Sequence, residues 1–235
     1  MKNYTILGKH PVIEAIKSKN IKVVKIFILK QNISILKQFE NIKYEVVENK
    51  FFKKNPDYKD YLHQGFAAKI ITENKDIKES IKSRRNIVLL DGVNDPRNQG
   101  SIFRNCLAFN ITDIIIEKKI FKEESISMHL ASSGASMKVN IYKVSNLNNA
   151  IRELKKNQYW IFGLDGYAKK NISNVFFEKN CNAFIFGSEG YGLRKNIKEK
   201  CDELLKIEIS NEIESLNVSN ASAIALYELN KKNRP

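Results

Sequence analysis

The chain has 235 residues, 43% of them hydrophobic, which suffices for one large domain or two smaller ones with separate cores. Its 40 lysines and arginines outnumber 26 aspartates and glutamates, and the net charge of +14 predicts a polyanionic partner, either nucleic acid or an anionic membrane surface. The start MKNYTILGKH has no apolar signal core, and no run of about 18 apolar residues occurs, which excludes membrane insertion.

The positive charge is concentrated in the first third of the chain. Residues 1–85 carry a net charge of +10, from 19 basic and 9 acidic side chains, whereas residues 86–235 carry only +4. This asymmetry favours a polyanion-binding front attached to a more neutral body; the alternative is a lysine-rich composition spread over solvated faces. The three cysteines have no metal-binding or disulfide spacing, so reduced thiols in a cytoplasmic protein are expected.

The first elements in chain order alternate between helix and strand, which predicts a small α/β unit over residues 1–72. The charged stretch TENKDIKESIKSRR follows, and residues 73–85 within it are predicted to be a linker. The expected elements of the front unit are a helix at 9–18, a strand at 23–29, a short helix near ISILKQFE, a strand at 44–48, a basic segment FFKKN and an apolar segment at 63–71.

Residues 86–235 are predicted to form a second domain. Continuous apolar runs separated by helical stretches favour a parallel sheet that is covered on both faces. A final helix is expected over residues 215–232. The predicted strands are NIVLLDGV, ITDIIIE, VNIYKV, YWIFGLDG, NAFIFGSE and LLKIEIS.

Three of these strands end in unusually polar or glycine-rich loops, at 91–100, 186–193 and 207–217. Ligands of open α/β sheets bind at the carboxyl ends of strands, so these loops are candidate binding segments. The glycines of FGSEGYGL have the order G-x-x-G-x-G, a poor match to a dinucleotide fingerprint, and fit either a tight turn or a binding loop. Ser215 and Asn217 are good helix caps, so capping alone is the simple alternative there.

Three stretches occur in a fixed order: DGVNDPRNQGSIFRN, FGSEGYGL and IEISNEIESLNVSNASAIALYE. Together they resemble the three motifs of the SpoU/TrmH family of RNA ribose 2′-O-methyltransferases, in the SPOUT superfamily. The front third, with ILGKHPVIEAI and HQGFAAKI, is similar to the substrate-binding domain that precedes some of these enzymes. The two-domain arrangement resembles the branch that methylates a guanosine ribose in 23S ribosomal RNA.

The resemblance implies a fold and partners. The expected fold is α/β, with a parallel sheet whose C-terminal segment passes through a loop as a deep trefoil knot. Such knots are rare, and periodicity does not predict one. The family dimerises through this region, so a homodimer is expected, with a site that can be shared between subunits. S-adenosyl-L-methionine is the implied cofactor and structured RNA, 23S ribosomal RNA in this branch, the implied substrate; no metal and no membrane are implied.

The resemblance also implies how the cofactor is held. Backbone groups in the knot make most of the contacts, so glycine would keep side chains out of the way of the cofactor. An apolar lining suits a reaction in which a sulfonium and a developing alkoxide give neutral products. The matching positions are Gly187, Ile207 and Leu216, with Ile209 and Ser215 close by.

Four catalytic residues are implied in the same way: Arg104, Asn98, Glu189 and Asn217. A guanidinium hardly loses its proton, so Arg104 is expected to act as an electrostatic clamp on the 2′-oxygen or the adjacent phosphate. Asn98 would orient Arg104 or the ribose, and Asn217 would hold the third loop and align the hydroxyl. Glu189 would fix its loop, pair with Arg104 or accept a proton.

The chain departs from the family pattern in the third motif. The family usually has I-P-M-x-G before S-L-N, where this chain has IEISN at 207–211. Glu208 in place of proline relaxes the backbone and adds a negative charge near a cationic cofactor, which bears on cofactor affinity. Asn211 tolerates the left-handed conformation almost as glycine does.

Other residues and functions stay open. His10, His63 and His129 are expected to be packing or surface residues, and Tyr191 either contacts a substrate base or is simply an exposed loop aromatic. Two rival functions are a tRNA ribose 2′-O-methyltransferase, whose relatives generally lack the front domain, and a catalytically silent RNA-binding relative.

Overall fold

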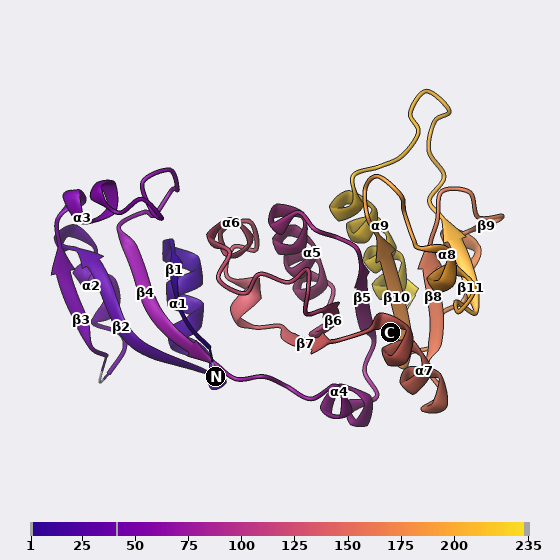
Figure 1. Cartoon of the computed structure of the whole chain (residues 1–235), viewed down its shortest axis with the longest axis horizontal. Helices are drawn as coiled ribbons and strands as arrows, with labels where there is room; N and C mark the ends of the chain where they lie inside the picture. The colour runs from indigo at the N-terminus through magenta and orange to yellow at the C-terminus, as the bar shows by residue number, and fades with distance from the viewer. Residues whose placement is uncertain (1, 41, 233–235) are drawn as a thin grey trace.

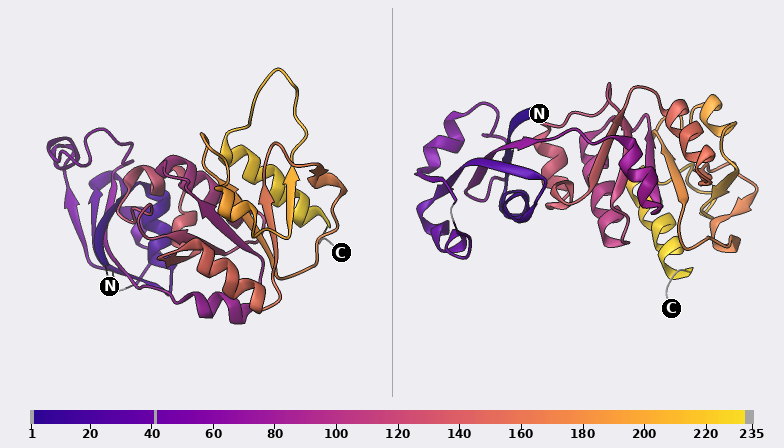
Figure 2. Two further views of the ribbon diagram at one scale, coloured as in Figure 1. Left: turned by 45° about the vertical axis from the view of Figure 1, so that its right-hand side comes forward. Right: turned by 90° about the horizontal axis from the view of Figure 1, so that it is seen from below.

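The computed structural model describes residues 2–40 and 42–232, which form two units joined by one extended segment (Figure 1). The units lie end to end, so the molecule is elongated in Figure 1 and in the right-hand view of Figure 2. Residues 1 and 41 of the first predicted domain and residues 233–235 of the second lie outside the described residues. No helix among the described residues is long and apolar enough to cross a membrane.

The first unit is a mixed four-stranded sheet. Its strands, in order across the sheet, are β1 (Lys2–Leu7), β4 (Phe66–Thr72), β2 (Ile21–Leu29) and β3 (Tyr44–Val47). Strands β1, β4 and β2 pair antiparallel, whereas β2 and β3 are parallel. Helix α1 (Lys9–Lys17) packs on the sheet through Val12 and Ala15, which are fully buried. The predicted small α/β unit is confirmed.

Two elements of this unit were not predicted. Strand β1 forms the edge where only a following helix was expected, and the basic segment FFKKN lies in helix α3 (Asn49–Lys54), because Phe52 is fully buried beneath it. A short 3-10 turn, η1 (Lys30–Asn32), precedes helix α2 (Ile33–Leu36).

The stretch predicted as a charged linker contains helix α4 (Ile77–Ser83). A capping box begins the helix: the Asp76 side chain accepts a hydrogen bond from the Lys78 amide at 3.0 Å, and Glu79 accepts one from the Asp76 amide. The polar and charged composition of this stretch predicted a linker, but the capping box stabilises a helix there. Only the part before α4 is extended.

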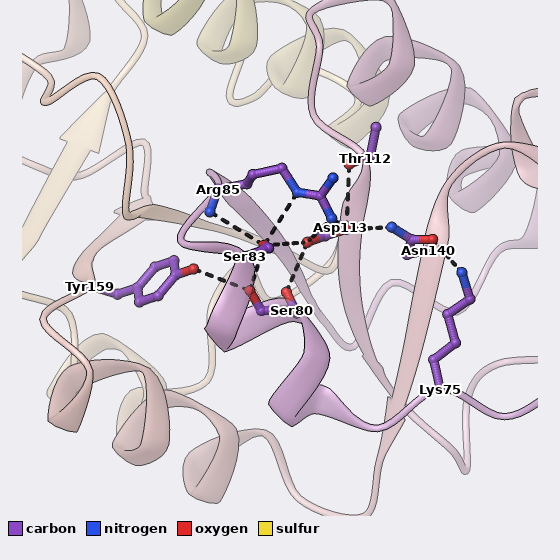
Figure 3. A network of polar contacts seen from close by, with 8 residues as sticks. All are labelled: Lys75, Ser80, Ser83, Arg85, Thr112, Asp113, Asn140 and Tyr159. Carbon is purple, nitrogen blue, oxygen red and sulfur yellow. Dashed lines mark hydrogen bonds and ion pairs between the residues drawn. The ribbon is translucent and has the colours of Figure 1, made fainter.

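Helix α4 is fastened to the second unit by the Asp113 carboxylate, which is fully buried (Figure 3). Ser80 Oγ donates to it at 3.1 Å, Arg85 Nη2 lies 3.2 Å from both of its oxygens, and Asn140 Nδ2 donates to it at 2.7 Å. Lys75 in turn donates to the Asn140 side-chain oxygen. A buried carboxylate is stable only with such partners, so this network fixes the end of the connecting segment.

The second unit is a seven-stranded sheet in which every neighbouring pair is parallel. All six predicted runs form strands, and the very short β9 is additional. In order across the sheet the strands are β7 (Asn140–Val144), β6 (Asp113–Glu117), β5 (Ile87–Asp91), β10 (Asn182–Gly187), β8 (Trp160–Leu164), β11 (Glu203–Lys206) and β9 (Lys170–Asn171).

Helices cover both faces of this sheet, as predicted. Alternate residues of each strand point to opposite faces, so Val88 and Leu90 join one hydrophobic cluster while Ile87 and Leu89 join the other. The first cluster is covered by α5 (Pro96–Ala108), α6 (Ile126–Ala131) and α9 (Val218–Lys232), and the second by α4, α7 (Leu147–Lys156) and α8 (Lys195–Lys198). The 3-10 turns η2 (Ala135–Met137) and η3 (Ile172–Asn174) lie in the connections.

The strand order reverses beside β5. The chain moves outward from β5 through β6 to β7 and then returns to β8, and β10 later inserts between β5 and β8. The carboxyl ends of β5, β10, β8 and β11 are therefore neighbours, and Asp91 at the end of β5 lies beside Gly187 at the end of β10. Such a switch point is where open α/β sheets bind ligands. The trefoil knot stays a prediction with which this strand order is compatible.

Candidate active site

A hollow of about 440 Å³ opens at the carboxyl ends of β8, β10 and β11. The long loop at 207–217, which rises at the upper right of Figure 1, supplies one wall, and the loops after β8 and β10 supply the others. All five residues predicted to hold a cofactor line it: Gly187, Ile207, Ile209, Ser215 and Leu216.

The lining is mixed: Phe186, Leu205 and Val218 add apolar surface beside the predicted residues, and Asp165, Glu189, Lys198 and Glu214 are charged. The residues at 207–217 lie outside the strands and the final helix, and five of them border the hollow: Ile207, Ile209, Glu214, Ser215 and Leu216. Ile207 and Ile209 both line the hollow, whereas Glu208 between them accepts a hydrogen bond from Asn171 Nδ2 at 2.8 Å. The negative charge of Glu208 therefore lies away from the hollow.

Gly187 has a second reason to be glycine besides the one expected. A Cβ atom placed there would lie 2.2 Å from the Gly192 carbonyl carbon and 2.4 Å from the Leu193 nitrogen. The loop closes on itself at this point, because the amides and carbonyls of Ser188 and Gly192 bond reciprocally at 2.9 and 3.0 Å. Close packing of the loop against its own strand therefore requires the glycine, in addition to any space that a ligand needs.

Three of the four predicted catalytic residues come together. Asn217 Nδ2 donates to Asn98 Oδ1 at 3.1 Å and also to Glu189 Oε1. These residues lie 119 and 28 positions from Asn217 in sequence, and each belongs to a different motif. One amide group therefore joins the three segments whose convergence was predicted.

Asn217 also caps the final helix. Its Oδ1 accepts hydrogen bonds from the Ser219 amide at 2.9 Å and from Ser219 Oγ at 2.6 Å, so α9 begins at Val218 and not at Ser215. Capping and a functional contact are not exclusive here, because the oxygen serves the helix while the nitrogen faces Asn98 and Glu189.

Arg104 lies apart from this group. Asn98 and Arg104 are six positions apart on α5, about 120° around the helix, so Asn98 is buried while Arg104 is exposed. Arg104 lines a second hollow of about 290 Å³ together with the turn at 132–135 and Lys138. Within the described part of the chain Arg104 forms no ion pair, so the suggested pairing with Glu189 is not found in a single subunit.

An ionic cluster that sequence reasoning missed holds the second-motif loop. Asp91, fully buried at the end of β5, accepts hydrogen bonds from the Arg194 amide at 2.8 Å and from Arg194 Nε at 2.5 Å, and Arg194 Nη2 lies 3.3 Å from Glu117. Burial alone would lower the pKa of Arg194, but the two carboxylates outweigh it and raise the pKa. The one sequence feature that could have indicated this cluster is the aspartate, Asp91, at the end of a buried apolar strand.

His63 and His129 are placed as expected for packing residues, and His10 is exposed at the surface. His129 is buried between the units and stacks on Tyr4, with ring centroids 5.6 Å apart, and burial lowers its pKa to about 4. His63 stacks on Phe52 at 3.9 Å. In the residues described, no group of three or more histidine, cysteine or acidic side chains could hold a metal ion.

A parallel α/β sheet with a hollow at its switch point and a polar network beside it is the arrangement in which α/β proteins bind their ligands and cofactors. The family model described as "SpoU rRNA Methylase family" matches residues 85–227, and the model "RNA 2'-O ribose methyltransferase substrate binding" matches residues 5–75. The chain belongs to the SpoU methylase family and is an S-adenosylmethionine-dependent RNA 2′-O-methyltransferase.

Similar proteins match most or nearly all of the chain. The chain is 34% identical over 173 residues to the "23S rRNA (guanosine-2'-O-)-methyltransferase RlmB" of Xanthomonas campestris, covering 71% of this chain and 69% of the relative. It is 32% identical over 229 residues to an "Uncharacterized tRNA/rRNA methyltransferase" of Borreliella burgdorferi, covering 92% and 95%. The crystal structure of the SpoU methyltransferase AviRb from Streptomyces viridochromogenes, solved with its cofactor AdoMet, superposes with a TM-score of 0.84 at 18% identity, over 98% of this chain and 90% of that one.

The lining of the hollow fits S-adenosylmethionine. Leu205, Ile207 and Leu216 offer apolar surface for the adenosyl group, and the carboxylates of Glu189 and Glu214 line the same hollow and are attractive to a sulfonium cation. Glu208 adds no charge to this lining.

Proposed function

We propose that this enzyme methylates the 2′-hydroxyl of a guanosine in 23S ribosomal RNA. Two observations together support this proposal. The chain contains both domains, and it is 34% identical to a relative named for that reaction. The net charge of +10 over residues 1–85 supports a role of the front unit in holding a large folded RNA. We expect the enzyme to act in the cytoplasm, where ribosomal RNA is modified.

The proposed chemistry divides between the hollow and the amide network. S-adenosylmethionine supplies an electrophilic methyl group when it is bound. Asn98 and Asn217 would orient the ribose beside the hollow, because their amides already contact each other at 3.1 Å. The 2′-oxygen must lose its proton as it gains the methyl group, and we assign Glu189 as the acceptor because its carboxylate lies within this network.

We further propose that Arg104 acts across a homodimer. It lines a hollow separate from the one beside Asn217, which supports a site completed by a second copy of the chain. Helix α9 offers a surface for such a contact, since Ile224 and Tyr227 are 39% and 44% exposed despite their apolar character. Arg104 of one subunit would then clamp the 2′-oxygen or its phosphate at the site of the other.

The experiment is to map ribose methylation in total RNA from cells with and without the gene for this protein. The proposal expects one 23S guanosine to lose its 2′-O-methyl group and all tRNA positions to stay unchanged. Loss at a tRNA position instead would favour the second candidate, a tRNA 2′-O-methyltransferase, which the mixed tRNA/rRNA name of the Borreliella relative supports. An unchanged methylation map would contradict both the 23S ribosomal RNA and the tRNA candidate.

A further inference from the structure

Two tyrosine side chains stand almost fully exposed at the rim of the hollow. Tyr191 is 93% exposed and Tyr167 is 85% exposed, and both belong to its lining. Tyr191 lies in the loop after β10 and Tyr167 in the loop after β8, and these two strands are parallel neighbours in the sheet. The two rings are therefore presented from the same edge of the sheet.

Hydrogen bonds fix the backbone of both tyrosines. The Tyr191 amide donates to Ser188 Oγ at 3.3 Å, and the Tyr167 amide donates to Asp165 Oδ1 at 3.1 Å, while Asp165 is itself paired with Lys198 at 2.6 Å. The rings thus project into solvent from anchored turns. A large exposed aromatic on an anchored loop gains nothing for folding, because its apolar surface stays in water.

We propose that Tyr191 stacks on the base of the nucleotide that is methylated, with Tyr167 as a second stacking surface at the same rim. The inference rests on the proposed function, in which the hollow and its amide network are the methyl-transfer site. Proteins that recognise unpaired RNA splay bases out and stack them on aromatic rings, and such stacking accepts any base.

The position of Tyr191 favours an RNA base over the adenine of the cofactor. Tyr191 follows Glu189 by two residues, and Glu189 touches Asn217, where the ribose must lie for its hydroxyl to react. A base attached to that ribose would extend toward the neighbouring rim. The cofactor instead belongs inside the hollow, against Ile207 and Leu216.

The experiment compares Tyr191→Ala with Tyr191→Phe and with Phe176→Ala. Phe176 is a matched control because it is 81% exposed but is outside the lining of the hollow. An RNA that the wild-type enzyme methylates, whichever class it belongs to, is used in steady-state kinetics, and S-adenosylmethionine binding is measured by calorimetry. We expect Tyr191→Ala to raise KM for RNA about tenfold, with Tyr191→Phe and Phe176→Ala close to wild type, as the usual strength of base–aromatic stacking implies.

A second arm removes the base itself. Once the methylated nucleotide is mapped, an RNA with an abasic ribose at that position is compared with the intact RNA. The abasic RNA should have a higher KM with the wild-type enzyme. With Tyr191→Ala the KM should be the same for both RNAs, because the stacking partner of the base is already gone. Weakened S-adenosylmethionine binding with unchanged KM for RNA would assign the ring to the cofactor adenine and overturn the proposal. Unchanged values for both ligands would overturn it as well. Absence of wild-type activity on 23S RNA would instead refute only the proposed substrate.

Discussion

At the scale of single residues, Asn217 has two separable tasks. Its side-chain oxygen caps α9 through Ser219, and its nitrogen donates to Asn98 and Glu189. Serine is also a good helix cap but has no amide nitrogen to reach both partners. The substitution Asn217→Ser therefore separates a stabilising role from a catalytic one.

We expect Asn217→Ser to unfold within a few degrees of wild type, while kcat for RNA methylation falls about a hundredfold, the usual loss when one positioned donor is removed. Thermal unfolding and single-turnover methylation measure the two effects. Asn217→Ala is the comparison, since it should lose about 1 kcal/mol of stability as well. Equal activity of Asn217→Ser and wild type would reduce Asn217 to a cap.

His129 gives the protein a pH dependence that its surroundings define. Its Nε2 must donate to the Glu123 carbonyl at 2.8 Å, so Nδ1 accepts from Ser136 Oγ at 2.9 Å, and the buried ring is neutral. Burial lowers its pKa from 6.5 to about 4. The unfolded chain therefore binds the proton more readily, and stability that is complete above pH 6.5 is lost as the pH falls toward 4.

Between pH 7 and pH 4 we expect wild type to lose roughly 3 kcal/mol more unfolding free energy than His129→Gln, because glutamine cannot titrate. Urea unfolding at a series of pH values, run in parallel on both proteins, measures the difference. Identical pH dependence of the two proteins would mean that the folded state tolerates a charged ring at this position.

At the scale of elements, helix α4 depends on a buried charge. Asp113 holds Ser80 and Arg85 from the connecting segment and Asn140 from β7. Removing the carboxylate would leave these donors without their acceptor, so Asp113→Ala should cost about 3 kcal/mol of unfolding free energy. Denaturant unfolding checks this, with Glu153→Ala, an exposed member of a surface ion pair, as the control that should change little. A loss below 1 kcal/mol for Asp113→Ala would contradict the assigned role.

Elements differ in how well their sequences predict them. The strands of the second sheet were predicted because each is buried on both faces and forms an uninterrupted apolar run, as in IVLLD at 87–91. Helix α4 was missed because its stability comes from a capping box and from Asp113, which lies 33 residues from Ser80. Strand β1 was missed because its residues Lys2 and Asn3 are exposed and polar at the sheet edge.

The candidate site follows a similar division. The five residues of the hollow were predicted from motif resemblance, and the structure brings them together. The contacts of Arg194 were not predicted, because Asp91 and Arg194 are 103 residues apart in sequence and meet only through strand pairing. The packing reason for Gly187 was not predicted either, since it comes from the backbone of the same loop folding back on the strand. Contacts made by long-range pairing leave no local pattern to detect.

At the scale of the whole molecule, the proposed homodimer would bring Arg104 of one subunit to Asn217 of the other, since Arg104 lines a separate hollow in its own subunit. Arg104→Ala and Asn217→Ser should each lose most methylation activity when assayed alone. After the two variants are co-expressed, mixed dimers would contain one site with both native residues, so a substantial part of the activity should return. RNA methylation by the purified mixture measures this. No recovery in mixed dimers confirmed by mass spectrometry would place Arg104 and Asn217 in the same subunit's site.

The central claim is that the segments at 187–192 and 207–217 form one cofactor pocket, to which the segment near 98 is joined through the Asn98–Asn217 hydrogen bond. A crystal structure of this protein soaked or grown with S-adenosylmethionine tests it most directly. We predict electron density for the cofactor in the hollow bordered by Gly187, Ile207 and Leu216, with its methyl group facing Asn217. Density for the cofactor in the Arg104 hollow or between the two units, with this hollow filled only by solvent, would contradict the claim.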